Sequence, residues 1–186
     1  MLIRYASDLH LEGFINHSME DLNQRFLPLH ENDYKSILVL AGDISSSNIQ
    51  LLQFLKYQDK RFYKVLYIPG NHEYYNKHYE NWNTWLNVTL PLETKNTIWA
   101  AGEVKLFETE DCSFVLGTLW GDGGKNISDS WQVAQGLNDF RLIQYNEGRF
   151  RVPDMQYLNQ LQVNDIDKKL IKLNLTFKSF KKIVVV

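Results

Sequence analysis

Residues 2–10 of the chain read LIRYASDLH, an apolar run followed directly by an aspartate and a histidine. Two further segments have the same plan, SILVLAGD at residues 36–43 and VLYIPGNHE at residues 65–73. Short apolar runs that end in polar, glycine-containing turns are typical of buried strands in an α/β sheet. Ligand-binding residues of such sheets gather at the carboxyl ends of the strands. We therefore expect one edge of a sheet to bring together Asp8, His10, Asp43, Asn71 and His72.

The composition indicates a packed globular protein. The chain has 186 residues, of which 44% are hydrophobic and 13% aromatic, and this length predicts one domain over residues 1–186. A formal net charge of −2 does not favour a general nucleic-acid binder. Because Cys112 is the single cysteine, a disulfide framework and a thiolate zinc cluster are excluded. The sequence shows no signal peptide and no membrane-spanning run, so we expect a cytoplasmic protein without a membrane partner.

The order of the predicted elements indicates a mixed α/β fold. Apolar runs predict strands at Leu2–Ala6, Ser36–Ala41, Lys64–Ile68, Thr97–Ala100, Val104–Glu108, Ser113–Trp120 and Lys182–Val186. Helical spacing predicts helices at Ser47–Asp59, Asn81–Leu90 and Ser128–Leu137, and a long one from Pro153 to about Leu175. Strands that alternate with helices imply parallel pairing, whereas the closely spaced middle runs imply antiparallel hairpins. A mixed sheet, or two sheets, fits this order better than a purely parallel sheet.

The polar residues after the first three strands are suited to a divalent metal ion. Asp8 and His10 are two residues apart and can face the same way at a strand end. Asp43 follows a glycine, which allows a close approach of backbone and carboxylate to an ion. Asn71 offers an amide oxygen, and the imidazole of His72 need not bind the same ion. Carboxylate, imidazole and amide ligands together suit manganese, iron or zinc better than magnesium.

These motifs resemble those of a known family. Asp8-Leu9-His10, Gly42-Asp43 and Gly70-Asn71-His72-Glu73 are similar to the first three signature motifs of the calcineurin-like metallophosphoesterase superfamily. The surrounding strings Ser7–Leu11 and Leu40–Ile44 resemble its bacterial and phage members. Gly117–Trp120 and Asn138–Arg141 resemble further strings of a small bacterial branch, so the similarity extends over nearly the whole chain.

The resemblance implies a four-layer αββα sandwich in which helices flank two mixed β-sheets. It also implies a centre of two divalent ions, with manganese favoured and iron or zinc as alternatives. In that pattern Asp8 and His10 bind the first ion, Asp43 bridges the two ions and Asn71 binds the second. A metal-bridging hydroxide attacks phosphorus in line, and His72 protonates the departing oxygen or stabilises its charge. The implied reaction is hydrolysis of small phosphomonoester or phosphodiester substrates.

The chain departs from the family pattern at its end. The resemblance implies a further histidine motif after the next core strand and a later Gly-His-x-His motif, but the sequence stops on the apolar run Ile183–Val186. We interpret His17, His30 and His78 as ordinary residues that do not replace the missing ligands. Either the chain is a truncated product, which an uncapped apolar end favours, or it is a natural short form. In both cases we expect partial metal occupancy, impaired hydrolysis and self-association through an exposed sheet edge.

Three further residues are candidates for substrate contact. Trp120 offers an aromatic face, with core packing as the alternative, and Asp122 and Arg141 offer polar groups. Two other functions stay open. One is a non-catalytic module that binds metal and phosphate esters on the same scaffold. The other is a nuclease-like phosphodiesterase, although the charge balance does not support extended contact with DNA.

Overall fold

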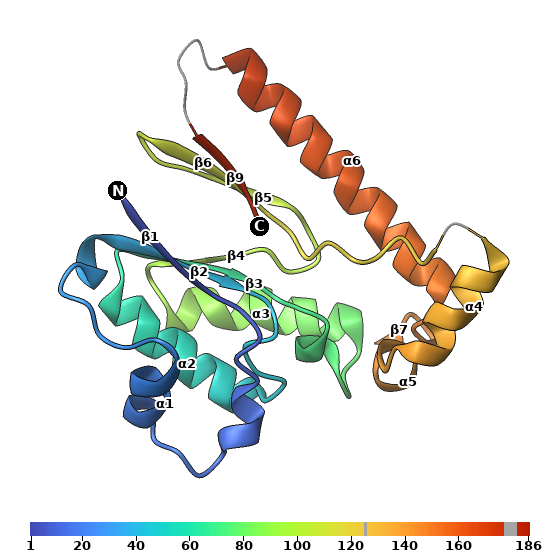
Figure 1. Cartoon of the computed structure of the whole chain (residues 1–186), viewed down its shortest axis with the longest axis horizontal. Helices are drawn as coiled ribbons and strands as arrows, with labels where there is room; N and C mark the ends of the chain where they lie inside the picture. Colours follow the sequence, from blue (N-terminus) through green and yellow to red (C-terminus); the bar gives the residue numbers. More distant parts are fainter. Residues whose placement is uncertain (125, 177–181) are drawn as a thin grey trace. The chain divides into compact units, whose positions relative to one another are not determined.

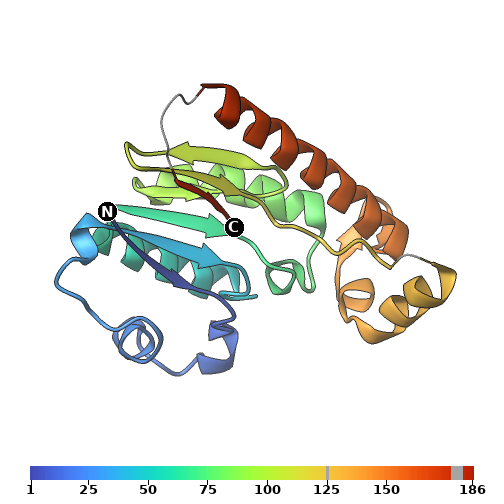
Figure 2. The same ribbon diagram turned by 45° about the horizontal axis from the view of Figure 1, so that its top comes forward.

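A computed structural model of the chain describes residues 1–124, 126–176 and 182–186 (Figures 1 and 2). The chain divides into two compact units. The first comprises Met1–Glu73 and Thr84–Trp99, and the second comprises Tyr74–Asn83 and Ala100–Val186. Helix α3 (Tyr79–Glu93) contributes residues to both units.

The first unit is built on a four-stranded parallel sheet in the order β1-β2-β3-β4. Its strands are β1 (Leu2–Ala6), β2 (Ser36–Ala41), β3 (Lys64–Ile68) and β4 (Thr97–Trp99). Ala6 pairs with Leu40 and Ala41 pairs with Ile68, so β1, β2 and β3 end almost level with one another. The loops that follow these three strands therefore leave the sheet at the same edge.

Helices α1 (Met19–Phe26) and α2 (Asn48–Arg61) lie on one face of this sheet in both views (Figures 1 and 2). Helix α2 packs against β3, and α1 packs against α2. Helix α2 begins where it does because the Ser47 hydroxyl accepts a hydrogen bond from the backbone N–H of Gln50. Short 3-10 turns lie at Leu11–Phe14, Asp33–Lys35 and His72–Tyr74.

The second unit contains a three-stranded sheet in the order β5-β6-β9. Strands β5 (Lys105–Glu108) and β6 (Cys112–Leu116) form an antiparallel hairpin, and β9 (Lys182–Val185) pairs parallel with β6. Leu173 of α6 (Val152–Thr176) packs with Val104 and Val115 in the core of this unit. The remaining elements are α4 (Ile127–Gly136), α5 (Asp139–Leu142), β7 (Gln144–Tyr145) and β8 (Gly148–Arg149).

The predicted α/β class, with sheets flanked by helices, is confirmed. Of the two larger sheets, the second is mixed as predicted, whereas the described strands of the first are all parallel. The bounds of the first three strands are confirmed to the residue. The strand predicted at Ser113–Trp120 ends at Leu116 instead, because Leu116 pairs with Lys105, the first residue of β5. Helix α1 was not predicted, although Ser18 and Asp21 form a complete capping box at its start. Within the described ranges, no helix is both long enough and apolar enough to span a membrane.

Candidate metal centre

The loops after β1 and β2 are joined by backbone hydrogen bonds. The N–H of Asp8 donates to the carbonyl of Gly42 at 3.1 Å, and the N–H of His10 donates to the carbonyl of Asp43 at 3.1 Å. A third bond of 2.9 Å runs from Leu11 to Ile44. This ladder continues the pairing of β1 with β2 beyond the sheet and places the side chains of Asp8 and His10 beside Asp43.

Asp8, His10 and Asp43 form a set that can hold one cation. Each offers a ligand atom, and these atoms all lie within 4.8 Å of one another. All three residues have left-handed backbones, with φ values of 54°, 46° and 55°. A non-glycine residue in that conformation costs about 1–3 kcal/mol, and such residues cluster at functional sites. Two carboxylates and an imidazole, held together on strained backbone, fit the ligand chemistry of manganese, iron or zinc.

The loop after β3 approaches the loop after β2 through two glycines. A Cβ on Gly42, whose φ is +84°, would lie 3.0 Å from the Cα of Gly70, and a Cβ on Gly70 would lie 2.6 Å from the backbone N of Asp43. The N–H of His72 donates to Oδ1 of Asp43 at 3.1 Å. Asn71 therefore lies between two residues that contact Asp43, in the loop predicted to supply the amide ligand.

Glu73 fixes the same two loops from below the surface. Its side chain is fully buried, and its carboxylate accepts backbone N–H groups of Asp43, Ile44, Ser45 and Gly70 at 3.0, 2.6, 3.2 and 2.8 Å. Burial and the charge of Asp43 raise the pKa of Glu73 to about 7, against the opposing effect of these N–H donors. Glu73 thus joins the turn that carries Asp43 to the turn that carries Asn71.

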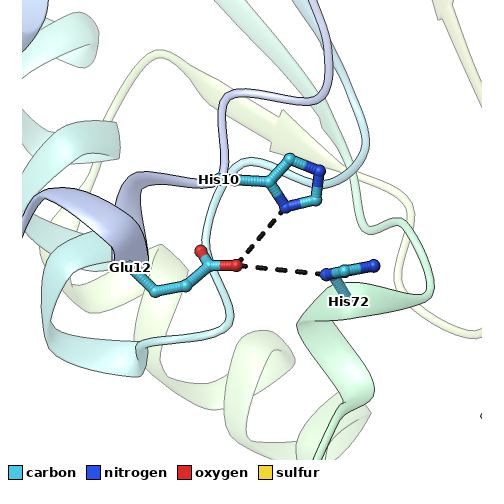
Figure 3. A group of neighbouring side chains, drawn as sticks. All are labelled: His10, Glu12 and His72. Atoms are coloured by element: carbon cyan, nitrogen blue, oxygen red, sulfur yellow. Dashed lines mark hydrogen bonds and ion pairs between the residues drawn. The ribbon is translucent and has the colours of Figure 1, made fainter. Parts of the chain in front are cut away.

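A second imidazole and a carboxylate lie next to His10. The ring centroids of His10 and His72 are 4.5 Å apart, with the rings at 69° to each other. Oε1 of Glu12 lies 3.4 Å from Nδ1 of His10 and 4.0 Å from Nδ1 of His72 (Figure 3). Oε2 of Glu12 accepts the N–H of Ser46 at 3.0 Å. Burial raises the pKa of Glu12, but hydrogen bonds from backbone N–H groups and from His10 outweigh it and hold this pKa below its usual value.

Comparison with known proteins places the chain in a family. The sequence profile of the calcineurin-like phosphoesterase family matches residues 1–171. The chain belongs to the calcineurin-like phosphoesterase family. An uncharacterized protein of Acanthamoeba polyphaga mimivirus is 29% identical over 177 residues, which are 90% of this chain and 58% of that protein. The chain therefore spans little more than half the length of this relative.

A solved structure shares the fold. The crystal structure of a phosphopantetheinyl hydrolase from Mycobacterium tuberculosis matches this chain with a TM-score of 0.70 and 16% sequence identity. The match covers 100% of this chain and 67% of the hydrolase. This likeness supports the calcineurin-like fold for the chain.

Most of the predicted metal ligands of this calcineurin-like family member meet at the sheet edge. Asp8, His10 and Asp43 are brought together, and His72 is placed beside His10. Asn71 lies in the adjoining loop, and its role as a ligand stays a prediction. Sequence reasoning missed Glu12 as a member of this cluster, although it follows His10 by two residues and a histidine ligand commonly needs a carboxylate partner.

The three predicted substrate contacts belong to the second unit. Trp120 is only 4% exposed, and its ring packs against those of Tyr74 and Phe150, as the core-packing alternative expects. Asp122 is exposed, and its Oδ1 accepts the N–H of Gly124 at 3.0 Å. Arg141 is exposed and donates to the carbonyl of Gln135 at 3.1 Å. Their contact with a substrate stays a prediction.

The other histidines make local contacts of their own. The ring of His17 packs edge-on against Phe14, and Nδ1 of His30 accepts the N–H of Asn32 at 3.2 Å. Nε2 of His78 lies 2.6 Å from the carbonyl of Asn146. Among the described histidines, cysteines and acids, the sets compact enough for an ion are Asp8-His10-Asp43 and His10-Glu12-His72.

Proposed function

We propose that this chain carries the metal centre of a metal-dependent phosphoesterase that hydrolyses phosphomonoesters or phosphodiesters. The observation that supports this most directly is the convergence of Asp8, His10 and Asp43 on left-handed backbone, beside a second imidazole. Membership of the calcineurin-like family supports the same reaction class. The hydrolase structure that shares the fold is consistent with it.

Each residue of the centre has a proposed role. Asp8, His10 and Asp43 would hold a first divalent ion, and Asp43 and the amide oxygen of Asn71 would hold a second. Bound cations would supply Lewis acidity toward a phosphoryl oxygen and lower the pKa of coordinated water. Manganese is the ion we favour, with iron and zinc as alternatives, because the donors combine imidazole with oxygen ligands.

His72 is the proposed proton donor. Its Nδ1 faces Glu12, so Nε2 is the nitrogen that would face a leaving group. From Nε2 the ring donates a proton to the departing oxygen, or a hydrogen bond that stabilises the charge on it. The backbone of His72 is held by a separate contact from its ring, because its N–H donates to Oδ1 of Asp43.

The proposed ligands are unevenly divided between the two ions. Asp8, His10 and Asp43 serve the first ion, whereas Asp43 and Asn71 are the described side chains that we assign to the second. We therefore expect the first ion to bind more tightly, with partial occupancy of the second. The same imbalance favours one alternative, a module that binds metal and phosphate esters without turning them over.

Manganese-dependent hydrolysis of nitrophenyl phosphate and bis(nitrophenyl) phosphate tests this proposal. We expect activity that needs Mn²⁺ and is lost in Asp43→Ala and His72→Ala, and the preferred ester identifies the substrate class. As a control, Asp165→Ala changes a carboxylate on α6 that pairs with Lys169, and activity should persist. Mn²⁺ at 100 times its Kd should also stabilise the fold by about 2.7 kcal/mol. Stabilisation without hydrolysis would favour the non-catalytic module, and the absence of both would contradict both proposals.

A further inference from the structure

One carboxylate oxygen faces two imidazoles at the candidate metal centre. Oε1 of Glu12 lies 3.4 Å from Nδ1 of His10 and 4.0 Å from Nδ1 of His72. In Figure 3 the other nitrogen of each ring points away from Glu12. The two rings therefore turn Nδ1 toward the same carboxylate oxygen, at hydrogen-bond distance for His10 and ion-pair distance for His72, and present Nε2 on the other side.

Glu12 is itself held in place. Its second oxygen, Oε2, accepts the N–H of Ser46 at 3.0 Å, in the turn that leads into α2. Its own backbone lies in the 3-10 turn Leu11–Phe14, directly after His10. The side chain is about three-quarters buried, with 28% of its surface exposed. A carboxylate anchored at one oxygen and partly desolvated can orient what its other oxygen contacts.

We infer that Glu12 is a positioning residue shared by His10 and His72. Its Oε1 is within hydrogen-bond distance of Nδ1 of His10, and at 4.0 Å its negative charge favours a proton on Nδ1 of His72. Glu12 thereby favours Nδ1–H on both rings and leaves each Nε2 facing outward. His10 then offers a bare Nε2 as a metal ligand. His72, when protonated on both nitrogens, donates the Nε2 proton to the leaving group and keeps the Nδ1 proton facing Glu12. This inference rests on the proposed function for the roles of the two rings, but the tautomers themselves do not depend on that function. Outer partners of this kind typically set the affinity of a metal ligand.

The chemistry of an amide shows why a carboxylate is needed at this position. In Glu12→Gln the side chain keeps its shape but has one acceptor oxygen instead of two. If that oxygen accepts the N–H of Ser46, the NH₂ group faces the imidazoles. The NH₂ group can donate only to an unprotonated Nδ1, so the proton of each neutral ring moves to Nε2. If the oxygen faces the imidazoles, the NH₂ group opposes the N–H of Ser46. In either arrangement the glutamine loses one contact that Glu12 makes, with the N–H of Ser46 or with the imidazoles.

The chain provides a matched control. Glu80 also follows a histidine by two residues, with a carboxylate oxygen 2.8 Å from Nδ1 of His78. Its other oxygen accepts a backbone N–H from a different loop, that of Asn146, at 3.3 Å. Glu80→Gln is therefore the same chemical change in a similar local setting, outside the candidate metal centre.

The experiment measures Mn²⁺ binding by calorimetry and histidine tautomers by long-range proton–nitrogen NMR of the metal-free chain. In the parent we expect Nδ1–H on both rings, with the signals assigned through His10→Gln and His72→Gln. In Glu12→Gln and Glu12→Ala we expect a shift toward Nε2–H and Mn²⁺ binding weakened by about 10- to 100-fold at unchanged stoichiometry. Glu80→Gln should leave the Mn²⁺ affinity and both tautomers as they are in the parent.

The outcomes separate this inference from the proposed function. Unchanged tautomers and unchanged affinity in both Glu12 variants would overturn the positioning role while the proposed function stands. A drop in the number of ions bound at saturation would also overturn it and make Glu12 a ligand. If the parent binds no Mn²⁺, the proposed function fails, and the tautomers alone decide whether Glu12 orients the two rings. Circular dichroism of each variant verifies that it is folded.

Discussion

Two histidine–glutamate pairs in this chain have nearly the same local design. His10 with Glu12 and His78 with Glu80 share the two-residue spacing, and both glutamates lie in the first turn of a helical segment. In each pair the carboxylate contacts Nδ1, at 3.4 Å in the first and 2.8 Å in the second. Each carboxylate also accepts a backbone N–H from a remote loop. The sequence pattern of histidine and glutamate alone would predict the same role for both pairs.

The pairs differ in what surrounds the histidine. Nε2 of His78 lies 2.6 Å from the carbonyl of Asn146, so both of its nitrogens face oxygen acceptors. No other described histidine, cysteine or acid completes a metal-binding set with His78 and Glu80. His10, in contrast, lies within reach of Asp8 and Asp43. A parallel sheet edge brings loops from three strands to one point, and this convergence distinguishes the candidate metal centre from the second pair.

The largest effect should come from removing the carboxylate of Asp43, which lies beside His10. Asp43→Asn leaves His10 and Glu12 in place but without the central acid of the set. We expect Mn²⁺ binding to weaken by more than the factor of about 100 that outer partners typically contribute, because a ligand itself is lost. Calorimetric titration measures this change.

The same variant should not unfold the chain, which separates a ligand role from a structural one. The amide oxygen that Asp43→Asn introduces can still accept the N–H of His72, and the negative charge that raises the pKa of Glu73 is removed. We therefore expect the metal-free variant to be at least as stable as the parent in urea. A metal-free chain that loses stability together with Mn²⁺ binding would contradict this reading of Asp43.

The next largest effect should come from Glu73, which joins the loops after β2 and β3. Glu73→Ala removes the acceptor of four backbone N–H groups at a fully buried position. Buried donors without a partner are costly, and we expect the free energy of unfolding to fall by about 3 kcal/mol. Urea unfolding of the metal-free chain measures it. Glu73→Gln, which keeps one acceptor oxygen, should lose less, and equal losses in both variants would argue against the hydrogen bonds as the cause.

A smaller effect comes from the glycine on which the close approach depends. In Gly70→Ala the new Cβ would lie 2.6 Å from the backbone N of Asp43, so the loops must separate. Overpacking of this kind costs about 1–3 kcal/mol, and displacement of Asp43 should weaken Mn²⁺ binding as well. Gly148→Ala, near the second pair, is the control, because a Cβ there has no atom within 4 Å. Similar losses in both variants would show that the close approach of Gly70 to Asp43 is not their cause.

The sequence predicts the convergence of the loops after β1, β2 and β3 where local pattern and topology agree. Runs such as Leu2–Ala6 are apolar over most of their length, and the residues after them meet because the strands are parallel and level. The pairing of β5 with β6 was equally readable from the closeness of their runs. Strand ends, and the loops that follow them, can be predicted from rules that act over a few residues.

The rest depends on contacts that no short pattern encodes. The partners of Glu73 lie up to 30 residues away, and Ser46 lies 34 residues from Glu12. The role of an acid that follows a histidine therefore depends on which distant segments of the chain pack beside the pair. The burial of Trp120 could not be predicted from a short pattern either, because its ring packs against Tyr74 and Phe150 from distant segments.

The smallest effect is expected at the second pair. His78→Ala removes an imidazole that contacts Glu80 and the carbonyl of Asn146 at a partly exposed position. Such contacts contribute modestly, and we expect unfolding to become easier by about 1 kcal/mol at most, with Mn²⁺ affinity unchanged. His10→Ala, measured beside it, should lose Mn²⁺ binding. If His78→Ala also weakened Mn²⁺ binding about tenfold, the two pairs would be functionally alike, and the sheet edge would not explain the difference between them.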